Sequence, residues 1–142
     1  MALKNLVVMG CSLNLSSSAG TIGSGNCSVT SNPSQAVKAD NKYAYFGSMT
    51  VAVSNATIAA TVAGTTGQGV NGSGTITING SAEKTFSPAG AGAQPALLEG
   101  DSGEGSVTFM FTTTTTPPTT TPVMLTCKVT ISGAGQSKVT AS

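Results

Sequence analysis

Ser34-Gln35-Ala36-Val37-Lys38-Ala39 is the stretch that organises this sequence, because it returns near the C-terminus as Gln136-Ser137-Lys138-Val139-Thr140-Ala141. A looser copy, Ala82-Glu83-Lys84-Thr85-Phe86-Ser87, lies 48 residues after the first copy and 54 residues before the last. The chain therefore divides into three units of similar length. Repeats of this period usually arise because one supersecondary unit cannot bury its apolar face alone and packs against its siblings. The repetition predicts a three-fold shape.

Composition predicts an all-β fold in one domain that covers residues 1–142. The chain holds 18 glycines and is rich in Thr, Ser and Ala, which is typical of short strands joined by tight turns. Hydrophobic residues make up 39%, which argues against disorder, and the length fits a single domain. Aromatic residues make up only 4%, so the core is built from small side chains and is thin. We therefore expect tightly interlocked strands or stabilisation by a partner.

The charge content argues against two classes of partner. Charged residues make up 8% of the chain, against about 25% in an average soluble domain, and the net charge is +1 with no Arg. Without a basic cluster to neutralise phosphates, nucleic-acid binding is disfavoured. No apolar run approaches the roughly 20 residues that cross a bilayer, so we expect no stable membrane anchor. Residues 4–11 resemble the end of a bacterial lipoprotein signal, but their apolar part is shorter than a secretory signal requires.

Hydrophobic patterning gives approximate strand positions. The dipeptide Asn79-Gly80 predicts a type I′ turn, since both residues accept positive φ angles. Thr112–Pro122 predicts an extended exposed connection or edge, because its prolines cannot donate to a ladder. Tyr43–Gly47 and Met49–Val53 are interpreted as a short strand pair. The other expected strands are Leu3–Leu15 (a strand or hairpin), Thr57–Val62, Gly74–Ile78, Ala96–Asp101 (a short strand plus turn), Val107–Phe111 and Val123–Ile131.

Cys11, Cys27 and Cys127 are the candidate metal ligands. Three thiolates with a carboxylate or water as fourth ligand could hold zinc, although the sequence has no CxxC pair and no His. Two alternatives stay open. Cys11 and Cys27 could form a disulfide worth about 3 kcal/mol, or all three could be buried free thiols. The cofactor prediction is accordingly zinc or none.

The residues offer little for catalysis. The chain has no His, which removes the commonest general base and the usual Ser-His arrangement. Glu99, Asp101 and Glu104 lie together in a Gly-rich stretch, but the spacing is not that of a calcium loop. We expect a solvated turn there, and a protein that is not an enzyme.

Three segments together resemble the PAAR-like spike-tip proteins of contractile injection systems. Each segment is short, and their order along the chain carries the resemblance. They are Val8-Met9-Gly10-Cys11-Ser12-Leu13, then Pro95-Ala96-Leu97-Leu98-Glu99-Gly100-Asp101, and finally Cys127-Lys128-Val129-Thr130-Ile131-Ser132-Gly133-Ala134-Gly135-Gln136.

The resemblance implies a small β-rich cone with pseudo-three-fold symmetry that caps a trimeric spike, one tip per trimer. Such a spike belongs to a phage tail, a type VI secretion apparatus or an extracellular injection particle. The implied role is structural: the tip concentrates force on the target envelope. The protein would be made in the cytoplasm, assembled at the tip of the particle and delivered outside the cell.

The chain departs from the family in three ways. Members coordinate zinc through several His and one Cys, and His is absent here. The Pro-Ala-Ala-Arg motif is reduced to Pro95-Ala96, followed by Leu97-Leu98. We expect no toxin domain after the third repeat, and we expect any effector to be a separate protein. The alternative function is a secreted or virion surface component, such as an adhesin domain, a pilin-like subunit or a decoration protein.

Overall fold

The computed structural model describes residues 4–33, 38–80, 85–86, 94–136 and 140–141. These residues are dominated by β-strands, so the all-β prediction is confirmed. Within these ranges no helix occurs, and therefore none with the length and apolar character to cross a membrane. The strands are β1 (Lys4–Asn5), β2 (Ser12–Ser17), β3 (Gly20–Val29), β4 (Lys38–Ala39), β5 (Lys42–Tyr43), β6 (Ser48–Val62), β7 (Thr65–Asn79), β8 (Thr85–Phe86), β9 (Gln94–Pro95), β10 (Ser102–Thr113), β11 (Thr120–Gly133) and β12 (Thr140–Ala141).

The strands fall into three units of the same design: β1 to β4, β5 to β8 and β9 to β12. Each unit has a short strand, an extended connection, two long strands linked by a turn or loop, and a second short strand. That last strand pairs with the first strand of the next unit, as β4 with β5 and β8 with β9. β12 of the third unit pairs with β1 and closes the cycle. The described residues of the three sequence copies are these last strands, β4, β8 and β12, together with Gln136, and their other residues lie outside the described ranges.

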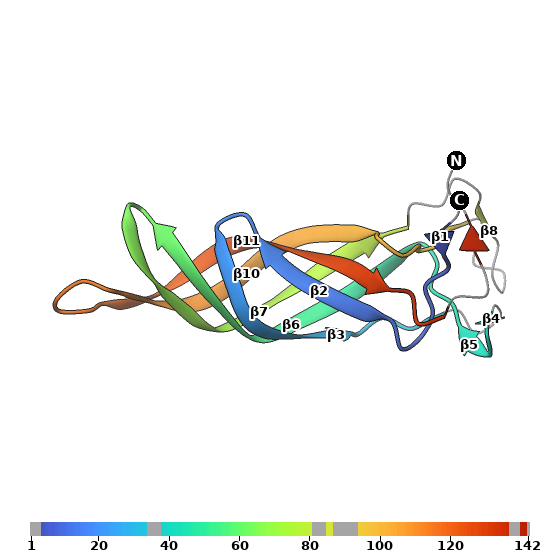
Figure 1. The fold of residues 1–142 in the computed structure, drawn as a ribbon, viewed down its shortest axis with the longest axis horizontal. Coiled ribbons are helices and arrows are strands. Elements are labelled where there is room, and N and C mark those ends of the chain that lie inside the picture. The colour runs from blue at the N-terminus through green and yellow to red at the C-terminus, as the bar shows by residue number, and fades with distance from the viewer. Residues whose placement is uncertain (1–3, 34–37, 81–84, 87–93, 137–139, 142) are drawn as a thin grey trace.

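The six long strands form one antiparallel sheet in the order β2-β11-β10-β7-β6-β3. Each unit again pairs with the next, through β3 with β6, β7 with β10, and β11 with β2. β2 and β3, which end this order, follow each other in the chain across a turn at Ser18-Ala19. The sheet therefore curls into a nearly closed barrel. Figure 1 shows an elongated molecule, with the long strands running toward one end and the short strands gathered at the other.

Alternating residues of the long strands fill the barrel. Val107, Phe109 and Phe111 of β10 point inward, as do Val129 and Ile131 of β11, and all are buried. Small residues opposite them leave room for the aromatic rings. A Cβ added at Gly72 would lie 2.5 Å from Phe109 Cε1, so that ring packs directly on the β7 backbone. The core combines aromatic and aliphatic side chains, and the strands interlock closely around it.

Two local predictions are wrong. Tyr43–Gly47 and Met49–Val53 do not pair with each other, because β6 begins at Ser48 and pairs with β3 and β7 instead. Asn79-Gly80 is not a type I′ turn. Neither residue has a positive φ, and the Gly80 N–H donates to the Gly47 carbonyl (2.8 Å).

The two-residue turns with paired positive φ angles lie elsewhere. Ala63-Gly64 joins β6 to β7 with φ angles of 51° and 81°, and Asp40-Asn41 joins β4 to β5 with 51° and 64°. The strands expected at Val107–Phe111 and Val123–Ile131 are confirmed within β10 and β11. The Thr/Pro tract forms the exposed end of the β10–β11 hairpin.

Candidate functional site

Three connecting segments, one from each unit, meet where the barrel ends and form a ring. The Val7 N–H donates to the Leu97 carbonyl (3.0 Å), and the Leu97 N–H donates to the Tyr45 carbonyl (3.2 Å). The Tyr45 N–H donates to the Val7 carbonyl (3.1 Å), which closes a cycle of three hydrogen bonds. We call these segments the ring: Leu6–Val8, Ala44–Phe46 and Ala96–Leu98.

A second cycle of hydrogen bonds surrounds the first. The Met9 N–H donates to the Tyr43 carbonyl (3.0 Å), and the Gly47 N–H donates to the Pro95 carbonyl (2.7 Å). The Glu99 N–H completes the cycle at the Asn5 carbonyl (3.0 Å). Three isolated bridges repeat the same order: Leu6 with Leu98, Val8 with Ala44, and Phe46 with Ala96. Each unit thus makes equivalent backbone contacts with both of the others.

The side chains of the ring face two ways. Val7, Tyr45 and Leu97 join the barrel core. The residues on either side of them form a second apolar cluster, in which Phe46 is half-buried and the others are buried. The ring is therefore a plug with apolar packing on both faces. The buried members of the second cluster are Leu6, Val8, Ala44, Ala96 and Leu98.

A glycine with positive φ follows each ring segment, at Gly10 (88°), Gly47 (79°) and Gly100 (96°). Side chains are disfavoured in this conformation, so glycine follows the ring in all three units. In the third unit the next residue, Asp101, is buried, and its Oδ2 accepts the Leu98 N–H (2.9 Å). This carboxylate secures the turn that leads from the ring into β10.

The other acidic residues of that stretch have separate surroundings. Glu99 Oε2 accepts a bond from Asn5 Nδ2 (3.4 Å). Glu104 is exposed on β10, where it lies opposite Lys128 of β11. Asp101 is therefore engaged with the backbone, and the three carboxylates play different structural parts.

The short strand pairs surround the ring and form the end of the molecule that carries both termini (Figure 1). Polar side chains tie this end together. Lys42 Nζ donates to the Gly135 carbonyl (2.8 Å), and Gln136 Nε2 donates to the Leu6 carbonyl (2.7 Å). Lys38 Nζ lies 4.8 Å from the centre of the Tyr43 ring, within range of a cation–π contact. The three-fold regularity is greatest here, because the long strands differ in length among the units.

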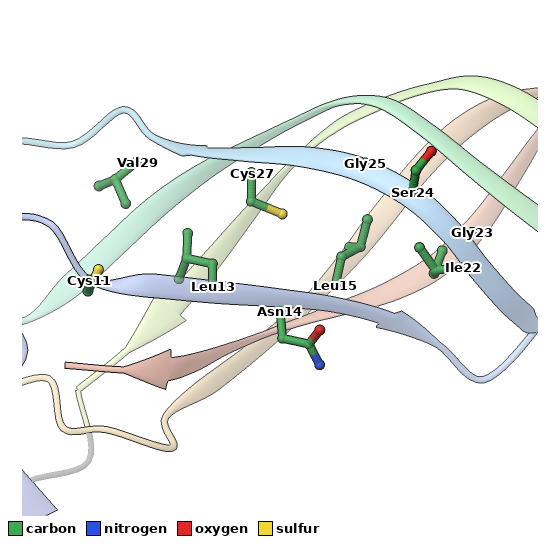
Figure 2. A pocket seen from close by; sticks show the side chains of 10 residues that line it. All are labelled: Cys11, Leu13, Asn14, Leu15, Ile22, Gly23, Ser24, Gly25, Cys27 and Val29. Atoms are coloured by element: carbon green, nitrogen blue, oxygen red, sulfur yellow. The ribbon is translucent and has the colours of Figure 1, made fainter. Parts of the chain in front are cut away.

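Between β2 and β3 the barrel wall is open, and we call this gap the seam. No ladder joins these two strands, although both are described throughout. Figure 2 shows them diverging, with side chains of both strands directed into the space between them. This space is a cavity of about 390 Å³. Its lining is Cys11, Leu13, Asn14, Leu15, Ile22, Gly23, Ser24, Gly25, Cys27 and Val29.

The structure separates the three cysteines. Cys11 and Cys27 line the seam and are half-buried, while Cys127 is buried in the barrel core on β11. All three are free thiols, so the Cys11–Cys27 disulfide is not formed. Burial raises the pKa of each thiol, and at Cys127 a hydrogen bond with Ser17 opposes that effect. The described residues contain no group of three His, Cys, Asp or Glu side chains suited to a metal, so this geometry gives the zinc prediction no support.

The outer wall of the barrel carries exposed apolar side chains. Val70 of β7 and Met110 of β10 are cross-strand partners, and Met124 of β11 lies opposite Thr108, two residues away from Met110. Met124 is 68% exposed. These side chains form an apolar patch across three neighbouring strands.

Sequence reasoning missed the ring. A signal was present, since an apolar triplet lies shortly before a glycine in all three units, as in Ala44-Tyr45-Phe46-Gly47. The segment at residues 4–11, compared above with a lipoprotein signal, contributes Val7 and Val8 to the ring, where both are fully buried.

Comparison with protein-family models, with curated proteins and with solved structures gives no match.

Proposed function

We propose that this chain is the structural tip that caps the trimeric spike of a contractile injection machine and helps it pierce the target envelope. Its resemblance to PAAR-like spike-tip proteins implies this role. The observation that supports it best is the ring, in which three units of one chain repeat the same backbone hydrogen bonds around a common axis.

The three equivalent units of the chain match the symmetry of a trimeric partner. A trimeric partner ends in three identical surfaces, and a single chain with three equivalent units can meet each of them in a similar way. The end built from the short strand pairs is the better docking face, because there the units resemble one another most. The low charge of the chain would limit the desolvation cost of that contact.

The opposite end suits contact with a target. The long hairpins extend away from the ring, and the β10–β11 hairpin reaches furthest (Figure 1). Interstrand ladders run along most of these strands, and the side chains inside are small or tightly packed. Force applied along the long axis is therefore carried by many backbone hydrogen bonds in parallel. No bond chemistry is required.

Two exposed methionines provide matched variants to test the docking face. Met9 is 46% exposed, and its N–H bonds to β5 beside the ring, whereas Met124 lies on β11 in the barrel wall. Tagged protein is isolated from its native host, and co-purified proteins are identified by mass spectrometry. We expect Met9→Arg to reduce recovery of a spike protein and Met124→Arg to leave it unchanged.

The opposite pattern would place the contact on the barrel wall. Copies of this chain recovered without any spike protein would favour the second candidate function, a secreted or virion surface or fibre component. The patch of Val70, Met110 and Met124 favours that candidate, since an exposed apolar surface can pack against a neighbouring subunit.

A further inference from the structure

The seam is a local departure from the three-fold design. In the second and third units, the two long strands are paired almost throughout, from Ser48–Asn79 to Val62–Thr65 and from Ser102–Thr130 to Thr112–Thr120. In the first unit, β2 pairs outward with β11 and β3 pairs outward with β6. The inner edges of β2 and β3 face each other without a ladder.

The strand that borders the seam on one side, β3, is irregular. The pairing of β3 with β6 is irregular between Ile22 and Ser24 and again between Ser24 and Asn26. Such shifts bend a strand and change its twist. They lie at Gly23-Ser24-Gly25, which line the seam. A Cβ added at Gly25 would lie 3.1 Å from Leu15 Cδ2, so the Leu15 side chain of β2 already packs against the β3 backbone at Gly25.

The facing edges define what the seam can bind. Alternate residues of an antiparallel strand direct their N–H and C=O groups to each side, so both β2 and β3 present free hydrogen-bonding groups to the gap. Unpaired edges of this kind accept an extended peptide as an added strand. A compact small molecule would leave most of these backbone groups without a protein partner.

The lining side chains restrict the occupant further. Leu13 and Leu15 of β2 and Ile22 and Val29 of β3 are half-buried members of the barrel core that remain open to the cavity. None of the ten lining residues is charged. A charged side chain placed there would lose hydration without gaining a partner. The occupant that fits is a neutral strand with apolar side chains on its inward face.

We propose that the seam binds an extended, uncharged polypeptide strand of a partner protein, which becomes the seventh strand of the barrel wall. This inference stands independently of the tip proposal, because it rests on β2, β3 and their lining rather than on the ring. Binding would cover the open part of the core and satisfy both strand edges at once.

A peptide copied from this chain can probe the seam. Ser48–Val53 of β6 is uncharged and turns Met49, Val51 and Val53 inward. All six residues pair with β7, and Val51–Val53 also pair with β3. The probe is this hexapeptide with blocked ends. The control is the same peptide with N-methyl groups on alternate amides, which keeps its side chains but removes hydrogen bonds.

Hydrogen exchange and thiol alkylation report on the seam. In the free protein we expect amides on the inner edges of β2 and β3 to exchange on the order of 100-fold faster than those paired between β6 and β7. At a peptide concentration ten times the Kd, exchange there and alkylation of Cys11 and Cys27 by iodoacetamide should slow about tenfold. Buried Cys127 is the internal control and should stay unreactive with or without peptide.

Three outcomes would overturn the proposal. Slow exchange of the seam amides in the free protein would mean that β2 and β3 pair with each other. Equal protection by the N-methylated peptide would mean that apolar contact alone drives binding. A complete lack of protection by the unmodified peptide at millimolar concentration would show that the seam does not accept a strand.

Discussion

Close packing of Phe109 on the β7 backbone makes Gly72 sensitive to the smallest substitution. In Gly72→Ala, the new Cβ would lie 2.5 Å from Phe109 Cε1 and 2.8 Å from Ala56 Cβ. Carbon atoms in ordinary contact are about 3.5–4.0 Å apart. The phenyl group of Phe109 or strand β7 must therefore move by about 1 Å. Phe109 is fully buried and has little room to move.

The expected cost follows from two opposing effects. Overpacking in a full core destabilises by about 1–3 kcal/mol. Replacing glycine with alanine also restricts the unfolded chain, which returns about 0.4–1 kcal/mol. We expect the free energy of unfolding to fall by about 1–2 kcal/mol. Phe109→Leu alone should cost about 2–3 kcal/mol, because it removes buried carbons and leaves a cavity.

The double variant tests whether the two residues are in contact. Phe109→Leu removes the phenyl atom Cε1, which the methyl group introduced by Gly72→Ala would meet. The double variant should therefore lose about 1 kcal/mol less free energy of unfolding than the sum of the two single variants. Urea unfolding followed by far-UV circular dichroism measures all four free energies. Gly133→Ala is the matched control, since its Cβ would meet Ser12 at an ordinary 3.5 Å. Additive effects, or no cost for Gly72→Ala, would refute this account of the core.

Three further predictions concern a turn, a bulge and the thiols. Asp101→Ala should lower the free energy of unfolding by about 2 kcal/mol, because the buried Leu98 N–H loses a charged acceptor, and Asp101→Asn should cost less; urea unfolding measures both. Asn55 has a φ of 51°, a conformation that glycine adopts easily and valine does not. Asn55→Val should therefore lower the melting temperature, while Asn55→Gly should leave it nearly unchanged. A similar loss in both variants would contradict the argument from backbone strain. Burial raises the pKa of Cys11 and Cys27 above 9.0, so the folded state keeps these protons after the unfolded chain has released them. Stability should therefore fall as the pH rises above about 9, and replacing both cysteines with Ser should reduce that slope in unfolding experiments from about pH 8 to about pH 11.

The fold class and the three-unit plan could be predicted because they depend on local signals. Alternating apolar residues predicted the strands at Val107–Phe111 and Val123–Ile131, and the recurring short stretch marked the last strand of each unit. The positions of turns were less accessible. Asn79-Gly80 has the composition of a hairpin turn, but Asn79 is the last residue of β7 and neither residue has a positive φ. The Gly80 N–H donates to the Gly47 carbonyl just before β6.

The ring and the seam depend on contacts that are distant in the sequence. The ring joins Val7, Tyr45 and Leu97, and no local pattern states that three such segments close a cycle. The seam lies between β2 and β3, whose apolar residues resemble those of the paired hairpins, so the local pattern does not distinguish it. The zinc prediction rested on residue type, and the structure places Cys127 on β11 in the core while Cys11 and Cys27 line the seam.

Native mass spectrometry of the complex isolated from the native host tests the three-fold capping role most directly. The ring's three equivalent units predict one copy of this chain bound to three copies of one spike protein, and any residual mass would reveal a bound metal. A complex with equal numbers of the two proteins, or a homopolymer of this chain, would contradict the three-fold capping role.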